Sequence, residues 1–198
     1  LVFSPNAKYI YVGRDGRDSV WSTHNHHVNM LDWVYEALEE LPDMGPVIQK
    51  PTTDDMREYF HDWFNREGYP FWPFWENVRA WWAVRDLPNV MMLHYQNLKN
   101  DMEGEMRKLG EFLECEVDES KWEEMVLHCT FDYMKHNAQE SAPLQGSLWA
   151  GGAETFVNKG TNDRWRDTLT EEDVAMYETR ADEELGADCA KWLATGEM

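Results

Sequence analysis

The sequence predicts an α/β protein in which helices cover a parallel sheet. Two apolar runs, residues 9–12 and 90–95, are rich in the β-branched, aromatic and long apolar side chains of buried strands, and turn residues follow each run. Helical patterns dominate between and after them. This alternation of strands and helices is typical of a parallel sheet with helices on its faces.

The length and the composition favour a single domain. A chain of 198 residues can hold one hydrophobic core, so we expect one domain over residues 1–198. No apolar run is long enough to span a membrane, and no signal peptide is evident, so we expect a cytoplasmic protein without a membrane partner. The three widely spaced cysteines indicate reduced thiols and neither a disulfide framework nor a zinc site; they are Cys115, Cys129 and Cys189.

The formal net charge of −20 argues against a nucleic-acid partner, because such a protein must neutralise phosphates. The acidity instead indicates a soluble surface, and it leaves adaptation of the host to salt open. The 11 tryptophans are many for this length, so we expect an aromatic core or pocket.

Three helices are expected in the first half of the chain. Residues 18–41 are periodic and stop before Pro42. A Thr-Asp-Asp start at Thr53 opens a helix towards Arg66. The third helix, residues 74–85, is rich in tryptophan.

In the second half, helices are expected over residues 101–113, 118–128, 130–137 and 170–185, the last beginning with a capping pattern, TEED. Residues 138–158 are expected to form a long loop, which suggests a function. Only two strands are convincing, which is few for such a sheet, so we expect the N-terminal part of the domain to be missing.

The segment KYIYVGRDGRDSVWS, residues 8–22, contains the strongest chemical signal. Arg14 ends the first strand, and Ser22 lies eight residues later in the following helix. Anionic ligands bind at the carboxyl ends of parallel strands. Because a guanidinium and a hydroxyl suit a phosphate, the segment predicts a phosphorylated ligand.

Three segments together resemble the cytosolic-type sulfotransferases that use 3′-phosphoadenosine 5′-phosphosulfate (PAPS). They are YIYVGRDGRDSVWS, the stretch from DLPNVMMLHYQNLKND through HCTFDYMK, and FVNKGTNDRWRDTLT. The resemblance covers nearly the whole chain in the right order. It implies a three-layer α/β fold like that of P-loop nucleotide hydrolases, truncated at its N-terminus.

The resemblance also implies a donor site. Arg14 and Ser22 would hold the 3′-phosphate of PAPS, and the backbone at Gly160 and the side chain of Lys159 would close on it. Asn158 stands where the family usually has arginine, so one cationic contact is weaker or comes from elsewhere.

The adenine of PAPS is expected to contact two aromatic residues. Phe131 would stack on the base, and Tyr95 would contact it from the end of the second strand. Cys129 lies where a threonine is common, which leaves one hydrogen bond to the adenine in doubt.

The whole protein would then transfer a sulfuryl group from PAPS to a hydroxyl or amine of a small molecule, release adenosine 3′,5′-bisphosphate (PAP) and need no metal. The lysine-bearing phosphosulfate loop and the catalytic histidine of the family have no counterpart here. We therefore assign no catalytic residue in this chain and expect the chain alone to be inactive. The acceptor and the oligomeric state stay open.

An acceptor pocket is expected beside the donor. His24, His26 and His27 do not form a metal triad, because only positions 24 and 27 share a helix face, and His26 is the candidate pocket residue. The candidate wall of this pocket is the Pro-flanked aromatic stretch with Phe71, Trp72 and Phe74; the alternative is that these rings belong to the core.

Two rival functions remain. One is a non-catalytic nucleotide-binding or interaction protein on the same scaffold. The other is a P-loop small-molecule kinase, although the chain lacks a G-x-x-x-x-G-K motif.

Overall fold

The computed structural model describes residues 4–41, 48–69 and 73–198. By its internal contacts the chain divides into two compact units, which we describe separately. Unit 1 comprises Leu1–Gly16, Trp75–Thr130 and Glu178–Met198, and unit 2 comprises Arg17–Phe74 and Phe131–Tyr177. The assignment of residues 1–198 to one domain stays a prediction.

Unit 1 contains a parallel pair of strands, as the sequence predicts. Strand β1 (Tyr9–Gly13) pairs with β2 (Val90–His94) in a register that runs from Tyr9 opposite Val90 to Gly13 opposite His94. The second strand ends one residue earlier than expected because Tyr95 begins a short helix, α5 (Tyr95–Asn100). His94 caps this helix by accepting a hydrogen bond from the backbone N–H of Gln96.

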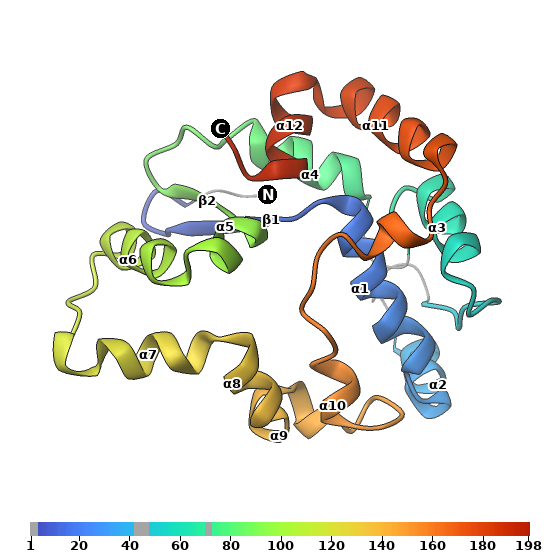
Figure 1. Cartoon of the computed structure of the whole chain (residues 1–198), viewed down its shortest axis with the longest axis horizontal. Coiled ribbons are helices and arrows are strands. Elements are labelled where there is room, and N and C mark those ends of the chain that lie inside the picture. Colours follow the sequence, from blue (N-terminus) through green and yellow to red (C-terminus); the bar gives the residue numbers. More distant parts are fainter. Residues whose placement is uncertain (1–3, 42–47, 70–72) are drawn as a thin grey trace. The chain divides into compact units, whose positions relative to one another are not determined.

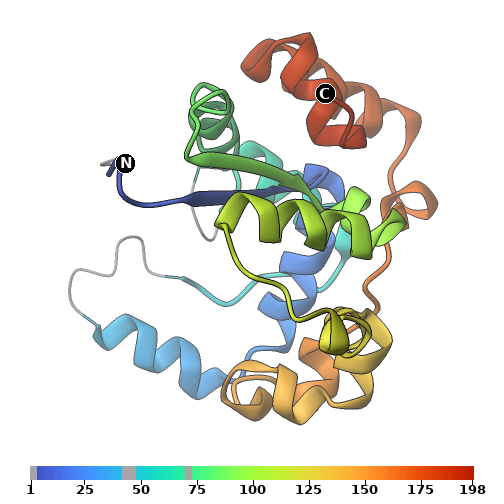
Figure 2. The same ribbon diagram turned by 90° about the vertical axis from the view of Figure 1, so that its left-hand side faces the viewer.

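Helices cover both faces of this small sheet (Figures 1 and 2). Helices α4 (Phe74–Trp82) and α12 (Ala187–Thr195) lie on one face, and α5 and α6 (Met102–Leu113) lie on the other. Trp81 of α4 stacks on Tyr11 at 5.3 Å between ring centroids, and Trp192 of α12 lies 5.3 Å from Trp82. The expected aromatic core therefore exists, and the α/β fold is confirmed.

The remaining helices of unit 1 match the sequence in part. Asp101 caps α6, and Asp118 caps a 3₁₀ turn, η1 (Glu119–Lys121), which leads into α7 (Trp122–Cys129). Helix α12 was not expected from the sequence.

In unit 2 the helix expected over residues 18–41 is wrong, because two helices form, α1 (Gly16–Asn29) and α2 (Asp32–Glu40). The break has a tertiary cause. The backbone N–H of Leu31 donates to the carbonyl of Leu148 at 3.0 Å, and Met30 forms a β-bridge with Trp149. Helix α3 (Met56–Asn65) begins later than expected.

The expected loop over residues 138–158 is also wrong in detail, since short helical turns fill much of it. They are α9 (Ala138–Ser141), η2 (Pro143–Gly146) and α10 (Ala153–Phe156), preceded by α8 (Phe131–His136) and followed by η3 (Arg164–Asp167). Ala138, Ala142 and Ala153 are buried here with Phe156 and Val157 packed against them. The small alanines let these turns pack closely.

Helix α11 (Glu171–Leu185) begins in unit 2 and continues into unit 1. The expected cap is confirmed: the Asp173 N–H donates to Oγ1 of Thr170 at 3.2 Å, and the Thr170 N–H donates to Oδ2 of Asp173 at 2.9 Å. Along the described stretches, no helix combines the length and the apolar character needed to cross a membrane.

Candidate functional site

In unit 1 the carboxyl ends of the two strands bring Arg14 and Tyr95 together. Gly13 and His94 are paired at the end of the parallel register, so the residues that follow them emerge side by side. The guanidinium carbon of Arg14 lies 4.3 Å from the centroid of the Tyr95 ring. Such a stack holds the guanidinium plane in a fixed direction.

Helix α12 fixes both strand ends. A Cβ atom at Gly13 would lie 2.3 Å from Cη2 of Trp192, so only glycine fits there. Nε2 of His94 lies 3.0 Å from the carbonyl of Leu193, and Nδ1 accepts from Gln96. Burial lowers the pKa of His94, which keeps the ring neutral near pH 7.

The cysteines are all free thiols. Cys129 is the exposed last residue of α7, within unit 1. Cys189 is buried in α12, and burial raises its pKa to about 11, so its thiol is protonated and inert.

In unit 2 one face of α1 lies along the segment 149–163, which runs in the opposite direction. At one end, the Asp163 N–H donates to Oδ1 of Asp18 at 2.7 Å. Further along, Nδ2 of Asn25 donates to the carbonyl of Thr155 at 2.9 Å. At the far end, the Ala150 N–H donates to the carbonyl of Asn29 at 2.7 Å.

Ser22 lies between these anchors on α1, and Lys159 lies between them on the facing segment. Ser22 shares a face with Asp18 because residues four apart on a helix lie above one another. Among the described residues, the Ser22 hydroxyl and the Lys159 ammonium have no hydrogen-bond or ion-pair partner. The two free donors therefore belong to facing elements, and Asn158 precedes Lys159 in the same stretch.

Phe131 supports this stretch from α8. Gly160 has a φ of +60°, and a Cβ atom there would lie 2.3 Å from Cδ2 of Phe131. Glycine is required for both reasons. Unit 2 thus brings Phe131 and Gly160 into contact next to Lys159.

His26 lies on the same face of α1, two turns beyond Asp18. Its ring lies 4.8 Å from Phe156 and 5.7 Å from Trp149. Burial lowers the pKa of His26, and its buried Nδ1 has no hydrogen-bond partner among the described residues. A neutral imidazole in an aromatic setting results.

The neighbouring histidines have separate partners. The ring of His27 lies 2.8 Å from the Tyr59 hydroxyl and from the Gln49 carbonyl, and His24 lies 3.0 Å from the Asp54 carbonyl. In the part of the chain that the structure describes, no three His, Cys, Asp or Glu side chains form a metal-binding group.

The aromatic wall proposed for an acceptor can be placed only in part. Phe74 begins α4, and its ring meets Trp63 edge-on at 5.0 Å. Phe71 and Trp72 lie outside the described residues.

Two residues of unit 2 have roles that the sequence did not indicate. Arg17 is 5 % exposed, and its guanidinium lies over the rings of Trp165 and Tyr177. Lys135 donates to two backbone carbonyls just before Asn158. The only available signal for Lys135 was its spacing of one helical turn from Phe131.

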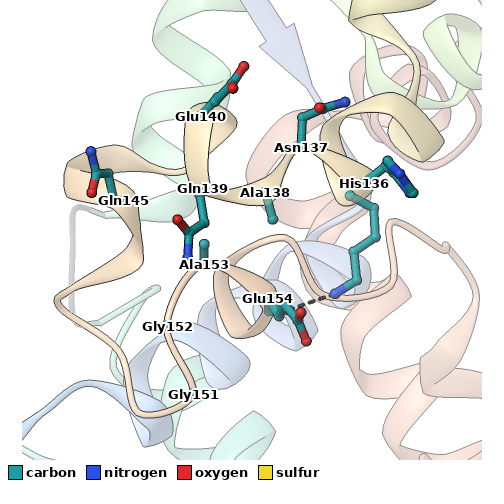
Figure 3. A pocket seen from close by; sticks show the side chains of 11 residues that line it. His136, Asn137, Ala138, Gln139, Glu140, Gln145, Gly151, Gly152, Ala153 and Glu154 are labelled. Atoms are coloured by element: carbon teal, nitrogen blue, oxygen red, sulfur yellow. Dashed lines mark hydrogen bonds between the residues drawn. The ribbon is translucent and has the colours of Figure 1, made fainter.

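A pocket of about 380 Å³ also lies in unit 2, between α8, α9 and the turn before α10 (Figure 3). Its walls are mainly polar, and none of the predicted site residues lines it. Among the residues described above, Lys135 of α8 lines it.

Comparison with known proteins places this chain in a family. Residues 1–188 match the family model described as sulfotransferase domain. Rat (Rattus norvegicus) sulfotransferase 1C2 is 28 % identical over 167 residues, which cover 83 % of this chain and 50 % of the relative. Luciferin sulfotransferase of Photinus pyralis is 28 % identical over 178 residues, which cover 86 % of this chain and 42 % of the relative.

Solved structures show the same fold. Retinol dehydratase in complex with androsterone and inactive cofactor PAP matches 90 % of this chain and 47 % of its own, with 25 % identity and a TM-score of 0.67. Mouse sulfotransferase SULT7A1 complexed with PAP matches 94 % of this chain and 61 % of its own, with 18 % identity and a TM-score of 0.66. The chain spans about half the length of the sequence relatives that it matches.

Proposed function

This chain belongs to the sulfotransferase family, and we propose that it supplies the 3′-phosphate and adenine half of a PAPS site. Bound PAPS would supply the sulfuryl group, which the whole protein would transfer to a hydroxyl or amine of a small molecule. The PAP complexes of two structural relatives support a nucleotide of this kind.

One observation carries the proposal: Ser22 and Lys159 are unpartnered donors on two facing elements of unit 2. A hydroxyl and an ammonium are suitable donors to phosphate oxygens, and Gly160 lets the backbone come close without a side chain. In this proposal Arg14 is a third donor, carried by the end of β1. A bidentate guanidinium suits the dianionic 3′-phosphate that distinguishes PAP from AMP.

For the base we propose two aromatic contacts. Phe131 stacks on the adenine, and Tyr95 contacts it from the end of β2. Cys129 offers only a weak hydrogen-bond donor where relatives commonly have a hydroxyl. Asn158 provides no charge, so Lys159 is the only cation of its stretch, residues 158–160.

For the acceptor we propose a pocket that includes His26 and the aromatic residues Phe71, Trp72 and Phe74. The relatives include a luciferin sulfotransferase and a 3-alpha-hydroxysteroid sulfotransferase, so a phenol and a 3-hydroxysteroid are the first acceptors to test. No catalytic residue is assigned in this chain, and no metal is part of the proposal.

Titration calorimetry with PAP and with 5′-AMP tests the donor site. We expect PAP to bind about 10- to 100-fold more tightly, because its additional phosphate receives charge-assisted hydrogen bonds. Arg14→Ala should remove most of that difference, and Ser22→Ala and Lys159→Met should each remove part of it. Equal affinities for the two nucleotides in the wild-type chain would contradict the proposal.

Arg66→Ala is the matched control, since the Arg66 guanidinium also lies over a tyrosine ring, Tyr69, at 3.5 Å. It should leave the preference for PAP unchanged. Transfer of label from [³⁵S]PAPS to an acceptor by the whole protein then separates a sulfotransferase from a non-catalytic binding protein. Transfer from [γ-³²P]ATP would instead indicate the small-molecule kinase.

A further inference from the structure

Lys135 lies on α8, four residues after Phe131, and its amine reaches the backbone of α10. Nζ donates to the carbonyl oxygen of Glu154 at 2.7 Å and also to the carbonyl of Val157. These carbonyls belong to α10 and to the residue that caps its C-terminal end. Carbonyls at a helix end lack partners within the helix, so an ammonium satisfies them well.

These two hydrogen bonds fix the upstream end of residues 158–160. Val157 directly precedes Asn158, and the ring of Phe131 lies against Gly160. Helix α8 therefore contacts the chain at both ends of residues 158–160. Lys135 binds the backbone just before them, and Phe131 lies against Gly160.

A second anchor lies downstream, at the start of α1. Asp18 accepts from the Asp163 N–H, and the guanidinium carbon of Arg17 lies 3.9 Å from the centroid of the Trp165 ring. Arg17 also lies 4.8 Å from the centroid of Tyr177. A guanidinium held between two rings in a buried setting is a strong and directional contact.

We infer that Lys135 is a positioning residue for Lys159 and Gly160, and that Arg17 and Asp18 hold the other end of the same loop. Lys135 acts through the backbone that it binds, and it is not a ligand of the phosphate. This inference rests on the proposed function. Because Lys159 is the only cation of residues 158–160, its direction matters more than in a loop with two cations.

Hydrogen exchange of the free chain tests the anchor without any ligand. In Lys135→Met we expect the amides of residues 157–163 to exchange about tenfold faster, while the rest of unit 2 is unchanged. Unchanged exchange in this segment overturns the inference and leaves the proposed function standing. Arg17→Lys keeps the charge but loses the planar contact, so it should raise exchange mainly over residues 163–166.

Calorimetry then tests the consequence for binding. We expect Lys135→Met to weaken PAP binding about tenfold and to leave 5′-AMP within about twofold, because AMP has no 3′-phosphate to receive Lys159. Lys135→Arg should restore most of the affinity, since a guanidinium can donate to both carbonyls. Lys135→Gln is the milder variant and should fall between the two.

The control is Lys121→Met, which removes a lysine with a 69 % exposed side chain from unit 1. It should change neither exchange over residues 157–163 nor PAP affinity. A loss of PAP affinity in Lys121→Met equal to that in Lys135→Met would indicate a general charge effect and would overturn the inference.

A double variant separates positioning from direct binding. If Lys135 acts through the loop, Lys135→Met should weaken PAP binding less in the Lys159→Met background than in the wild-type chain. Additive losses would make Lys135 an independent phosphate ligand and overturn the inference. Equal binding of PAP and AMP by the wild-type chain would overturn the proposed function itself.

Discussion

Unit 1 holds Arg14 at the end of a strand that packs on aromatic rings along one face, whereas unit 2 holds Lys159 in a segment held by individual polar contacts. Around Arg14 the supports are Gly13, Tyr95 and the buried Trp192. Around Lys159 they are the two hydrogen bonds that Lys135 donates to backbone carbonyls and the one that Asp18 accepts from the Asp163 N–H. Packing spreads its energy over many atoms, while a hydrogen bond can be removed by one substitution.

Trp192→Ala should have the largest effect on stability. Trp192 is 1 % exposed and packs on Tyr11, Trp82 and His94. The substitution leaves a cavity, so we expect the free energy of unfolding to fall by about 3–5 kcal/mol. Urea denaturation followed by circular dichroism measures this loss.

The control for this variant is Trp33→Ala, which truncates a tryptophan that is 52 % exposed. It should change the free energy of unfolding by no more than about 0.5 kcal/mol. Similar losses in both variants would refute the claim that unit 1 depends on its aromatic packing.

Asp173→Asn should have an intermediate effect, because it weakens a polar anchor of unit 2. The Asp173 side chain is 4 % exposed and accepts from Arg57 at 2.6 and 3.1 Å, with His61 at 2.9 Å. Since Arg57 remains solvated, we expect a loss of about 1–3 kcal/mol at pH 7. The exposed Asp167→Asn is the matched control and should be nearly neutral.

The loss in Asp173→Asn should also depend on pH. The hydrogen bond from Arg57 holds the pKa of Asp173 below its ordinary value of 3.8. The unfolded chain therefore takes up this proton first, and the contribution of Asp173 is complete above pH 3.8 and declines as the pH falls below it. Denaturation at pH 7 and pH 3 should show a smaller gap between wild type and variant at the lower pH.

His27→Gln should have the smallest effect. His27 is 3 % exposed, and burial lowers its pKa from the ordinary 6.5. Unfolded histidine binds the proton more readily, so stability should fall as the pH drops below 6.5. Between pH 7.5 and 5.5 we expect the stability of the wild type to fall more steeply than that of the variant.

Thermal denaturation at both pH values measures this contribution. His136→Gln, at an exposed position, should keep the slope of the wild type. A slope in His27→Gln that equals the wild-type slope would show that the other buried histidines carry the whole effect.

Local signals predicted the elements whose cause lies in nearby residues. The strand of residues 9–12, the capping box at Thr170 and the helix expected from residue 101 all depend on contacts within a few positions, and all three are present. The break at Leu31 escaped because its cause, the carbonyl of Leu148, is remote in the sequence.

The same difference applies to the candidate site. The family pattern pointed to Arg14, Tyr95, Phe131 and Gly160, and the contacts of Arg14 with Tyr95 and of Phe131 with Gly160 are present in the structure. Lys135 had no such signal, because a lysine that binds backbone carbonyls looks like any surface lysine in the sequence. The roles of all these residues in binding stay predictions.

The contact between Gly13 and Trp192 has a consequence for the order in which the protein is made. A ribosome synthesises residue 13 long before residue 192, at about 5–20 residues per second. Trp192 can therefore pack against Gly13 only after α12 has emerged and docked, so this strand end stays uncovered in the nascent chain for about 10–40 seconds.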